Sequence, residues 1–151
     1  LPEEYIVKSV ATVPGTDGRK MSKSYDNTIP LFLDEAKLKK LVRRIPTDST
    51  PVEDPKDPDS SSVFHILEQF AGPDTTTEVR KRLEAGGMGW GDLKNELFDT
   101  LNDLLAPLRQ RYTELMDPTS ELDDILDTGA ERARQRARPV LAGVKTAVGT
   151  G

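Results

Sequence analysis

The chain has 151 residues, which suits one domain of ordinary size with a hydrophobic core. It has no cysteine, which excludes disulfides and zinc–cysteine sites, and its formal net charge of −5 means that any contact with nucleic acid needs a local basic patch. No apolar run approaches the length of a membrane span, so we expect a water-facing, mainly helical protein of a reducing compartment such as the cytoplasm.

Residues 5–10, Tyr-Ile-Val-Lys-Ser-Val, are rich in β-branched side chains and predict a short strand. One strand alone would have an unpaired edge. We therefore expect it to join a sheet that lies outside this chain.

The most informative segment follows, from Gly15 to Ser24, with the sequence Gly-Thr-Asp-Gly-Arg-Lys-Met-Ser-Lys-Ser. Its glycines allow motion and close approach of the backbone to a ligand. Lys20 and Lys23 are mobile point charges that can follow a phosphate, while serine hydroxyls and free backbone N–H groups can bind the remaining phosphate oxygens. The pattern predicts a mobile polyphosphate-binding loop, with a solvated basic turn as the alternative.

From residue 34 onward the pattern predicts helices. Asp34 is a favourable N-cap for an amphipathic helix that ends before Pro46, and four prolines between residues 46 and 59 predict a loop. Residues 60–62 can cap a second helix. Its buried residues, at helical spacing, are predicted to be Val63, Phe64, Leu67 and Phe70.

The only histidine of the sequence, His65, falls on this second helix, and we expect it to be partly buried rather than catalytic. A third helix is predicted to begin near Asp74 and to end at Gly86-Gly87.

The segment after Trp90 predicts the longest helix of the chain. Its apolar residues recur every three or four positions and predict a core stripe of Leu93, Leu97, Leu101, Leu104, Leu108, Tyr112 and Leu115. Pro107 lies within this stripe and should kink the helix or mark its boundary.

The last part of the chain is divided by charge. Residues 117–128 hold five acidic residues and predict a short helix, while residues 129–151 hold five basic residues and one acidic residue and predict a last helix from 130 to about 148, separated by Gly129. In one interpretation the two helices pair through surface charges. In the other, four arginines contact nucleic-acid phosphates, namely Arg132, Arg134, Arg136 and Arg138.

Residues 20–24, Lys-Met-Ser-Lys-Ser, resemble at every position the signature loop of class I aminoacyl-tRNA synthetases. The flanking residues 11–15 and 25–32, and the later segments 47–49, 89–94 and 106–112, are similar in order and spacing to the bacterial tryptophanyl-tRNA synthetases. The resemblance covers essentially the whole chain and favours tryptophan over tyrosine.

This resemblance implies that the intact enzyme activates L-tryptophan with ATP and transfers the tryptophanyl group to tRNA(Trp). Lys20 and Lys23 would be catalytic, stabilising the pyrophosphate leaving group, with Lys23 the more important of the two. The implied ATP-binding residues are Val10, Lys20, Met21, Ser22, Lys23 and Ser24. Mg²⁺ would accompany ATP, held by phosphates and water rather than by a metal site in this chain.

The implied organisation is residues 1–33 as the tail end of the catalytic domain with the signature loop, and residues 34–151 as a C-terminal helical domain that binds the anticodon arm of tRNA. We predict a mainly α fold, an irregular bundle of five or six helices behind an extended arm. The four arginines of the last helix become candidate tRNA contacts. The intact enzyme would be a homodimer with no membrane contact.

The nucleotide-binding α/β half that precedes the signature loop in this family is not represented in the sequence, since the family's His-x-Gly-His motif does not occur. We therefore interpret the chain as a C-terminal portion that is inactive alone, with the tryptophan pocket elsewhere. Two alternatives stay open: a stand-alone helical RNA-binding module that retains the loop, and a purely structural or interaction domain.

Overall fold

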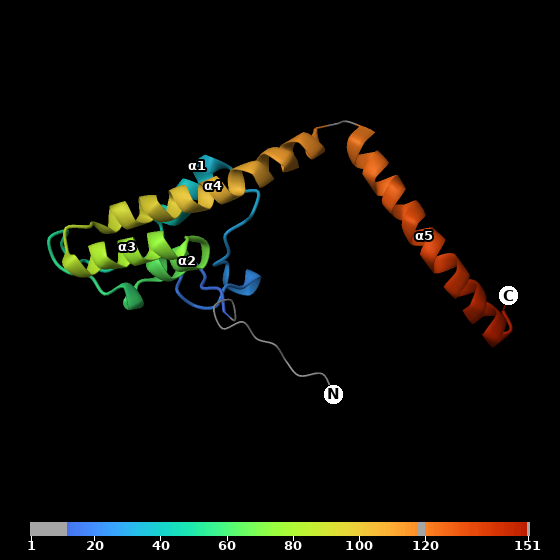
Figure 1. Ribbon diagram of the computed structural model, residues 1–151, viewed down its shortest axis with the longest axis horizontal. Helices are drawn as coiled ribbons and strands as arrows, with labels where there is room; N and C mark the ends of the chain where they lie inside the picture. Colours follow the sequence, from blue (N-terminus) through green and yellow to red (C-terminus); the bar gives the residue numbers. More distant parts are fainter. Residues whose placement is uncertain (1–11, 118–119, 151) are drawn as a thin grey trace. The chain divides into compact units, whose positions relative to one another are not determined.

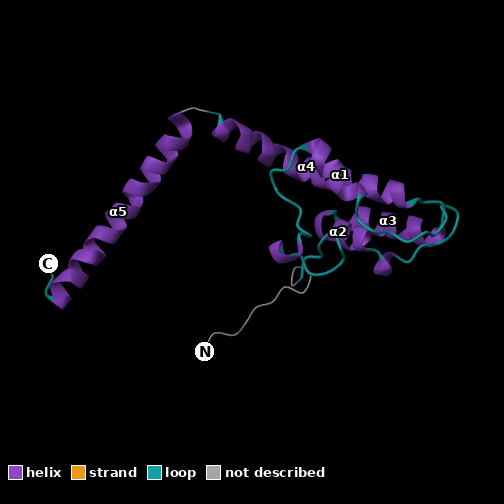
Figure 2. Cartoon of the chain, turned by 180° about the vertical axis from the view of Figure 1, so that it is seen from behind, coloured by secondary structure: helices purple, strands orange, loops and turns teal. Residues whose placement is uncertain are grey.

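A computed structural model describes residues 12–117 and 120–150, and the predicted mainly α-helical class is confirmed (Figure 1). The α-helices in these ranges are α1 (Glu35–Arg43), α2 (Ser62–Phe70), α3 (Pro73–Ala85), α4 (Trp90–Met116) and α5 (Ser120–Val148), with short 3-10 helices η2 (Lys23–Tyr25) and η3 (Pro58–Ser60). No strand occurs within the described ranges (Figure 2). The predicted strand at residues 5–10, and with it Val10, lies outside them.

The chain divides into two compact units, Leu1–Arg109 and Gln110–Gly151. The first unit holds one hydrophobic core, to which helices α1, α2, α3 and α4 all contribute. Its fully buried side chains include Leu38 and Val42 of α1, Phe64 and Leu67 of α2, Leu83 of α3, and Leu93 and Leu97 of α4. In the second unit, α5 has no buried residue in the part of the helix that is described.

The helix starts follow the capping residues that the sequence predicts. The Asp34 carboxylate accepts a hydrogen bond from the Lys37 amide, and the Ser61 hydroxyl accepts one from the Phe64 amide. Each bond satisfies an amide that the first helical turn leaves without a partner. Pro73 occupies the first turn of α3, where its missing N–H costs nothing.

Four predicted core residues are wrong, because Phe70, Leu104, Leu108 and Tyr112 are all exposed. Phe70 is 40% exposed because it closes α2 at its last turn, beyond the packed residues, and Ile66 is buried instead. Leu104 is 50% exposed, whereas Leu105 is buried. A step of four from Leu101 fits a helix as well as a step of three, so periodicity alone does not choose between positions 104 and 105.

The predicted division of the long helices is corrected, whereas the predicted end of the last helix near residue 148 is confirmed. Helix α4 continues through Pro107, and α5, with 29 residues, is longer than α4, with 27. Gly129 does not separate two helices, because α5 runs through it. A helical glycine costs only about 1 kcal/mol, and acidic residues in the first half of α5 with basic ones in the second suit the helix dipole.

One consequence is that the acidic and basic segments cannot pair as neighbouring helices, because they are successive parts of α5. Within the described ranges their ion pairs lie elsewhere: Arg134 pairs at 3.8 Å with Glu131 inside the basic segment, and Glu121 of the acidic segment pairs with Arg111 of α4. None of the helices within the described ranges is both long and apolar enough to cross a membrane.

Candidate functional site

The segment from Val13 to Asn27 folds back on itself. Pro14 and Lys20 form an isolated antiparallel bridge. The Gly15 amide donates to the Arg19 carbonyl at 2.6 Å, and the Met21 amide donates to the Val13 carbonyl at 2.8 Å. In this structure the signature loop comprises residues 13–27, which include the motif at residues 20–24. The bridge between Pro14 and Lys20 holds two sides of this loop together.

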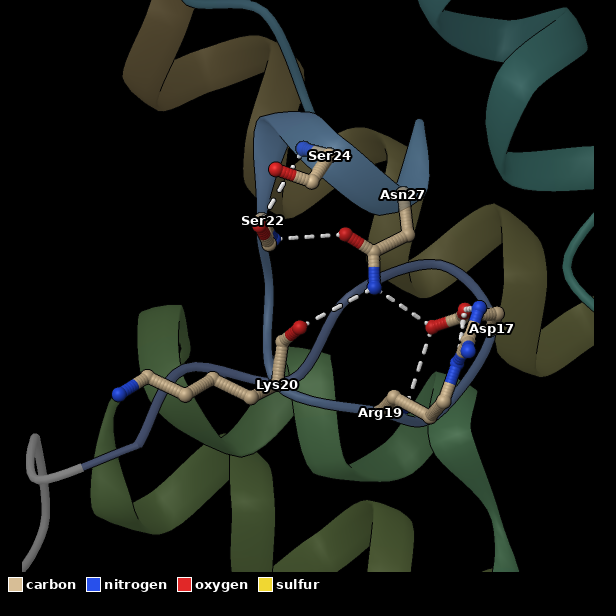
Figure 3. Close-up of polar contacts among 6 residues, drawn as sticks. All are labelled: Asp17, Arg19, Lys20, Ser22, Ser24 and Asn27. Carbon is tan, nitrogen blue, oxygen red and sulfur yellow. Dashed lines mark hydrogen bonds and ion pairs between the residues drawn. The ribbon is translucent and has the colours of Figure 1, made fainter.

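The side chain of Asn27 lies at the centre of the signature loop and is 1% exposed (Figure 3). Its Oδ1 accepts a hydrogen bond of 2.7 Å from the Ser22 amide. Its Nδ2 donates to Asp17 Oδ1 at 2.7 Å and to the Lys20 carbonyl at 3.2 Å. One amide therefore ties together three points of the loop that lie between five and ten residues away in sequence.

Two glycines make this packing possible. A Cβ atom on Gly15, which is buried, would overlap the Asn27 side-chain amide. Gly18 has a φ of +80°, which favours glycine, and a Cβ there would lie 2.5 Å from Ser62 Oγ of α2. The glycines were predicted to give the loop mobility; in the structure they also allow close packing, Gly15 against Asn27 and Gly18 against Ser62 of the same compact unit.

Asp17 and Arg19 of the loop neutralise each other. Arg19 Nε donates to Asp17 Oδ2 at 2.7 Å, and the guanidinium lies 4.4 Å from the centre of the Tyr25 ring. The hydrogen bond from Asn27, followed by the contacts with Arg19, lowers the pKa of Asp17 to about 2. Arg19 is thus already paired, and it adds little net charge for a ligand.

The two lysines of the motif, unlike Arg19, are not paired with an acidic residue in the described part of the chain. Lys20 and Lys23 are exposed, and neither ammonium forms an ion pair or hydrogen bond with any residue in the described ranges. Figure 3 shows the Lys20 side chain extending away from Asn27. Lys23 begins η2, whose N-cap is Ser22, with Ser22 Oγ accepting from the Ser24 amide at 3.2 Å. The loop therefore offers two cations that are available to an anion.

The sequence predicts that free backbone amides of the loop bind phosphate oxygens, but three of these amides are already hydrogen-bonded. The amides of Met21, Ser22 and Ser24 are bound within the loop by Val13, Asn27 and Ser22 respectively. A phosphate here would meet lysine ammonium groups and serine hydroxyls more than main-chain N–H groups. Met21 is half-buried.

A small cleft of about 260 Å³ lies between the loop and α2. Its lining includes Lys20 and Gly18 from the loop and His65, Glu68 and Gln69 from α2. His65 is partly buried, as predicted. Within the described ranges, no group of three acidic or histidine side chains is arranged to hold a metal ion.

The four candidate arginines of α5, Arg132, Arg134, Arg136 and Arg138, are all exposed. They lie in the second compact unit, and the signature loop lies in the first.

Sequence reasoning did not single out Asp17 and Asn27, although both lie within or beside the motif. Neither residue type is rare in loops, and nothing in the linear pattern signals that position 27 is buried. The available signal was the small residue at position 15, which leaves room for a side chain from elsewhere.

The chain is similar in sequence to one family of known proteins. Residues 1–106 match the family model described as tRNA synthetases class I (W and Y). The chain is 46% identical over 149 residues to the tryptophan–tRNA ligase of Pseudomonas aeruginosa and 43% identical over 141 residues to that of Rhodopirellula baltica. These alignments cover 99% and 93% of the chain and 33% and 44% of the relatives.

A solved structure gives the same relationship. The tryptophanyl-tRNA synthetase of Campylobacter jejuni, crystallised with ADP and tryptophan, matches with a TM-score of 0.89 and 42% identity, over 99% of this chain and 47% of that one. The chain thus spans about a third of the length of the first curated relatives, 33% in the Pseudomonas case, and under half of the solved structure.

Proposed function

The chain belongs to the class I tRNA synthetases of the tryptophan and tyrosine family, and from this premise we propose that it is the C-terminal portion of a tryptophanyl-tRNA synthetase. The complete enzyme would join L-tryptophan to ATP, release pyrophosphate, and pass the tryptophanyl group to tRNA(Trp). Tryptophan rather than tyrosine is favoured by the ligases that match 99% of the chain.

The observation that carries the proposal is the pair of available lysines on the signature loop. In the activation step a tryptophan carboxylate oxygen attacks the α-phosphorus of ATP. As that bond forms, the bond from the α-phosphorus to the bridging oxygen breaks, and negative charge moves onto pyrophosphate. Cations fixed near the leaving group stabilise this developing charge. Lys20 and Lys23 have the charge and exposure for this role.

The remaining loop residues take supporting roles. The hydroxyls of Ser22 and Ser24 would donate to phosphate oxygens, and Met21 would hold the loop on its base. Val10, outside the described residues, would touch the adenine. Mg²⁺ would arrive with ATP and share the neutralisation of its phosphates; the charge on Lys20 and Lys23 complements that neutralisation and does not replace it.

For the helical part we propose tRNA contacts through the exposed arginines of α5. They would act on phosphates, which carry affinity without sequence information. The domain boundary at residue 34, a homodimer and a cytoplasmic location complete the proposal. A stand-alone RNA-binding module has less support, because the similarity to ligases runs from the loop through the helices.

Tryptophan-dependent exchange of pyrophosphate into ATP tests the proposal. A complete synthetase that contains this segment should catalyse the exchange, and the 151-residue chain alone should not, since positioning of the substrates supplies much of the rate. Exchange by the isolated chain, or exchange by the complete enzyme that is indifferent to loss of both lysines, would contradict it.

A further inference from the structure

Asn27 has features that the chemistry of the lysines does not explain. It lies three residues beyond the motif, yet it is 1% exposed and uses both ends of its amide. A buried amide with all its contacts made is costly to disturb, because each lost bond leaves a polar group unsatisfied.

The partners of Asn27 lie on the backbone of the motif itself. Nδ2 donates to the carbonyl of Lys20, and Oδ1 accepts from the amide of Ser22 (Figure 3). These two groups flank Met21, so a single planar side chain fixes both sides of the short segment between the lysines. The first bond acts directly on the residue that carries one of the two cations.

The hydrogen bond from the Ser22 amide to Asn27 Oδ1 acts on Lys23 indirectly, through Ser22. Ser22 is the N-cap of η2 and accepts from the Ser24 amide with its hydroxyl, and Lys23 is the first residue of η2. An Asn27 that holds the Ser22 amide therefore sets the start of η2 and the direction in which Lys23 leaves it.

We propose that Asn27 is a positioning residue that holds Lys20 and Lys23 in the arrangement that meets a pyrophosphate group. The proposal rests on the function proposed above and names a residue outside the five-residue motif. Asp17 takes part in the same hydrogen-bond network. It accepts the third hydrogen bond of the Asn27 amide and also forms an ion pair with Arg19. Asn27 itself does not touch the phosphate.

A purely structural role would look different. The side-chain partners of Asn27 all lie within the signature loop, at residues 17, 20 and 22, and none lies on a helix of the core. Removal of the amide should therefore change the loop's affinity for phosphate while leaving the helical unit folded.

The experiment uses the 151-residue chain, labelled with ¹⁵N, with inorganic pyrophosphate as the probe at low ionic strength. Amide shifts of residues 20–24 report binding. We compare the unchanged chain with Asn27→Ala, with Lys23→Ala, and with Asn95→Ala as a matched control, because Asn95 is an exposed asparagine of α4. Thermal unfolding followed by circular dichroism reports the fold of each variant.

We expect Asn27→Ala to bind pyrophosphate about tenfold more weakly, since a preorganised site loses affinity when its groups become free to move. Asn95→Ala should bind as the unchanged chain does, and Lys23→Ala should lose most of the shift. Equal affinity of Asn27→Ala and the unchanged chain, with loss in Lys23→Ala, overturns the positioning role and leaves the proposed function standing. Absence of binding by the unchanged chain overturns the positioning role, because the loop then does not hold its lysines ready for pyrophosphate; the function of the complete enzyme is tested separately by the exchange reaction.

A second variant covers the case in which Asn27→Ala does not fold. Asp17→Ala removes one partner of the Asn27 amide at a partly exposed position, so the fold is at less risk. Weaker pyrophosphate binding by this variant supports the positioning role of Asn27; unchanged binding overturns it.

In a complete synthetase, Asn27→Ala should lower kcat about 100-fold with the KM for tryptophan unchanged, because misplacement acts on the reacting groups. Loss confined to that KM would contradict the proposal.

Discussion

The side-chain amide of Asn27 donates a 2.7 Å hydrogen bond to the carboxylate of Asp17, ten residues before it in the chain. This bond joins the turn at Gly18 to the end of η2. The same nitrogen, Asn27 Nδ2, also donates to the Lys20 carbonyl, so the Asp17 carboxylate lies beside the group that holds the backbone of Lys20.

The first prediction concerns pH. The pKa of Asp17 is lowered to about 2, chiefly by the bond from Asn27, so its contribution to loop stability is fully present above the ordinary value of 3.8. It is lost as the pH falls toward 2 and Asp17 takes up a proton. A ¹³C-detected titration of Asp17 should show this midpoint, and Asn27→Ala should raise it toward 3.8. The midpoint of Asp59, whose pKa is lowered by Arg80, should stay the same in both chains.

The second prediction concerns Gly15. In Gly15→Ala the new methyl group would overlap the Asn27 amide, and overpacking of this kind costs about 1–3 kcal/mol. Hydrogen exchange of the Met21 and Ser22 amides should become faster. Gly91→Ala is the control, because a Cβ there meets no atom within 4 Å. Unchanged exchange in Gly15→Ala would show that the loop can expand without cost.

The third prediction concerns catalysis. In a complete synthetase, Lys23→Ala should lower the rate of tryptophan activation by about two to three orders of magnitude, as expected for loss of one preorganised group that acts on transition-state charge. Single-turnover measurements of adenylate formation give this rate. Lys40→Ala, which removes an exposed lysine of α1, should have no effect. A change limited to the KM for tryptophan would argue against a leaving-group role.

The fourth prediction separates two leucines of α4. Leu101 is 2% exposed and Leu104 is 50% exposed. Leu101→Ala should lower the free energy of unfolding by about 2–5 kcal/mol, whereas Leu104→Ala should cost far less, because only the first leaves a cavity. Urea denaturation followed by circular dichroism measures both. Equal losses would contradict the assignment of the core face.

The fifth prediction concerns α5. Positions 132 and 136 share one face of the helix, and positions 134 and 138 share another, since each pair is four residues apart. If one face binds tRNA, the double alanine variant of that pair should weaken tRNA binding and reduce its dependence on salt, while amino-acid activation stays intact. The other pair should matter little. Affinities at several salt concentrations, in a complete synthetase, decide this, and no change in either pair would rule out the arginines as contacts.

The sequence by itself determined the local features of this protein. Asp34 and Ser61 begin helices where capping chemistry predicts, and the prolines of residues 46–59 keep that segment free of α-helix. The motif at residues 20–24 and its flanking segments were enough to indicate the family that the comparisons show. These features depend on residues close together in the chain, so a linear pattern carries them.

Only the tertiary structure decided which side of each helix meets the core and what holds the loop. Leu105 rather than Leu104 is buried because of what packs against α4, and the same spacing allows both. Lys56, buried at 3% exposure, donates to the carbonyls of Pro51 and Asp54, which no charge pattern predicts. Asn27 likewise becomes the centre of the signature loop only when Gly15, Asp17 and Ser22 surround it. Burial and hydrogen bonding depend on neighbours brought together by folding, and those neighbours are distant or unmarked in the sequence.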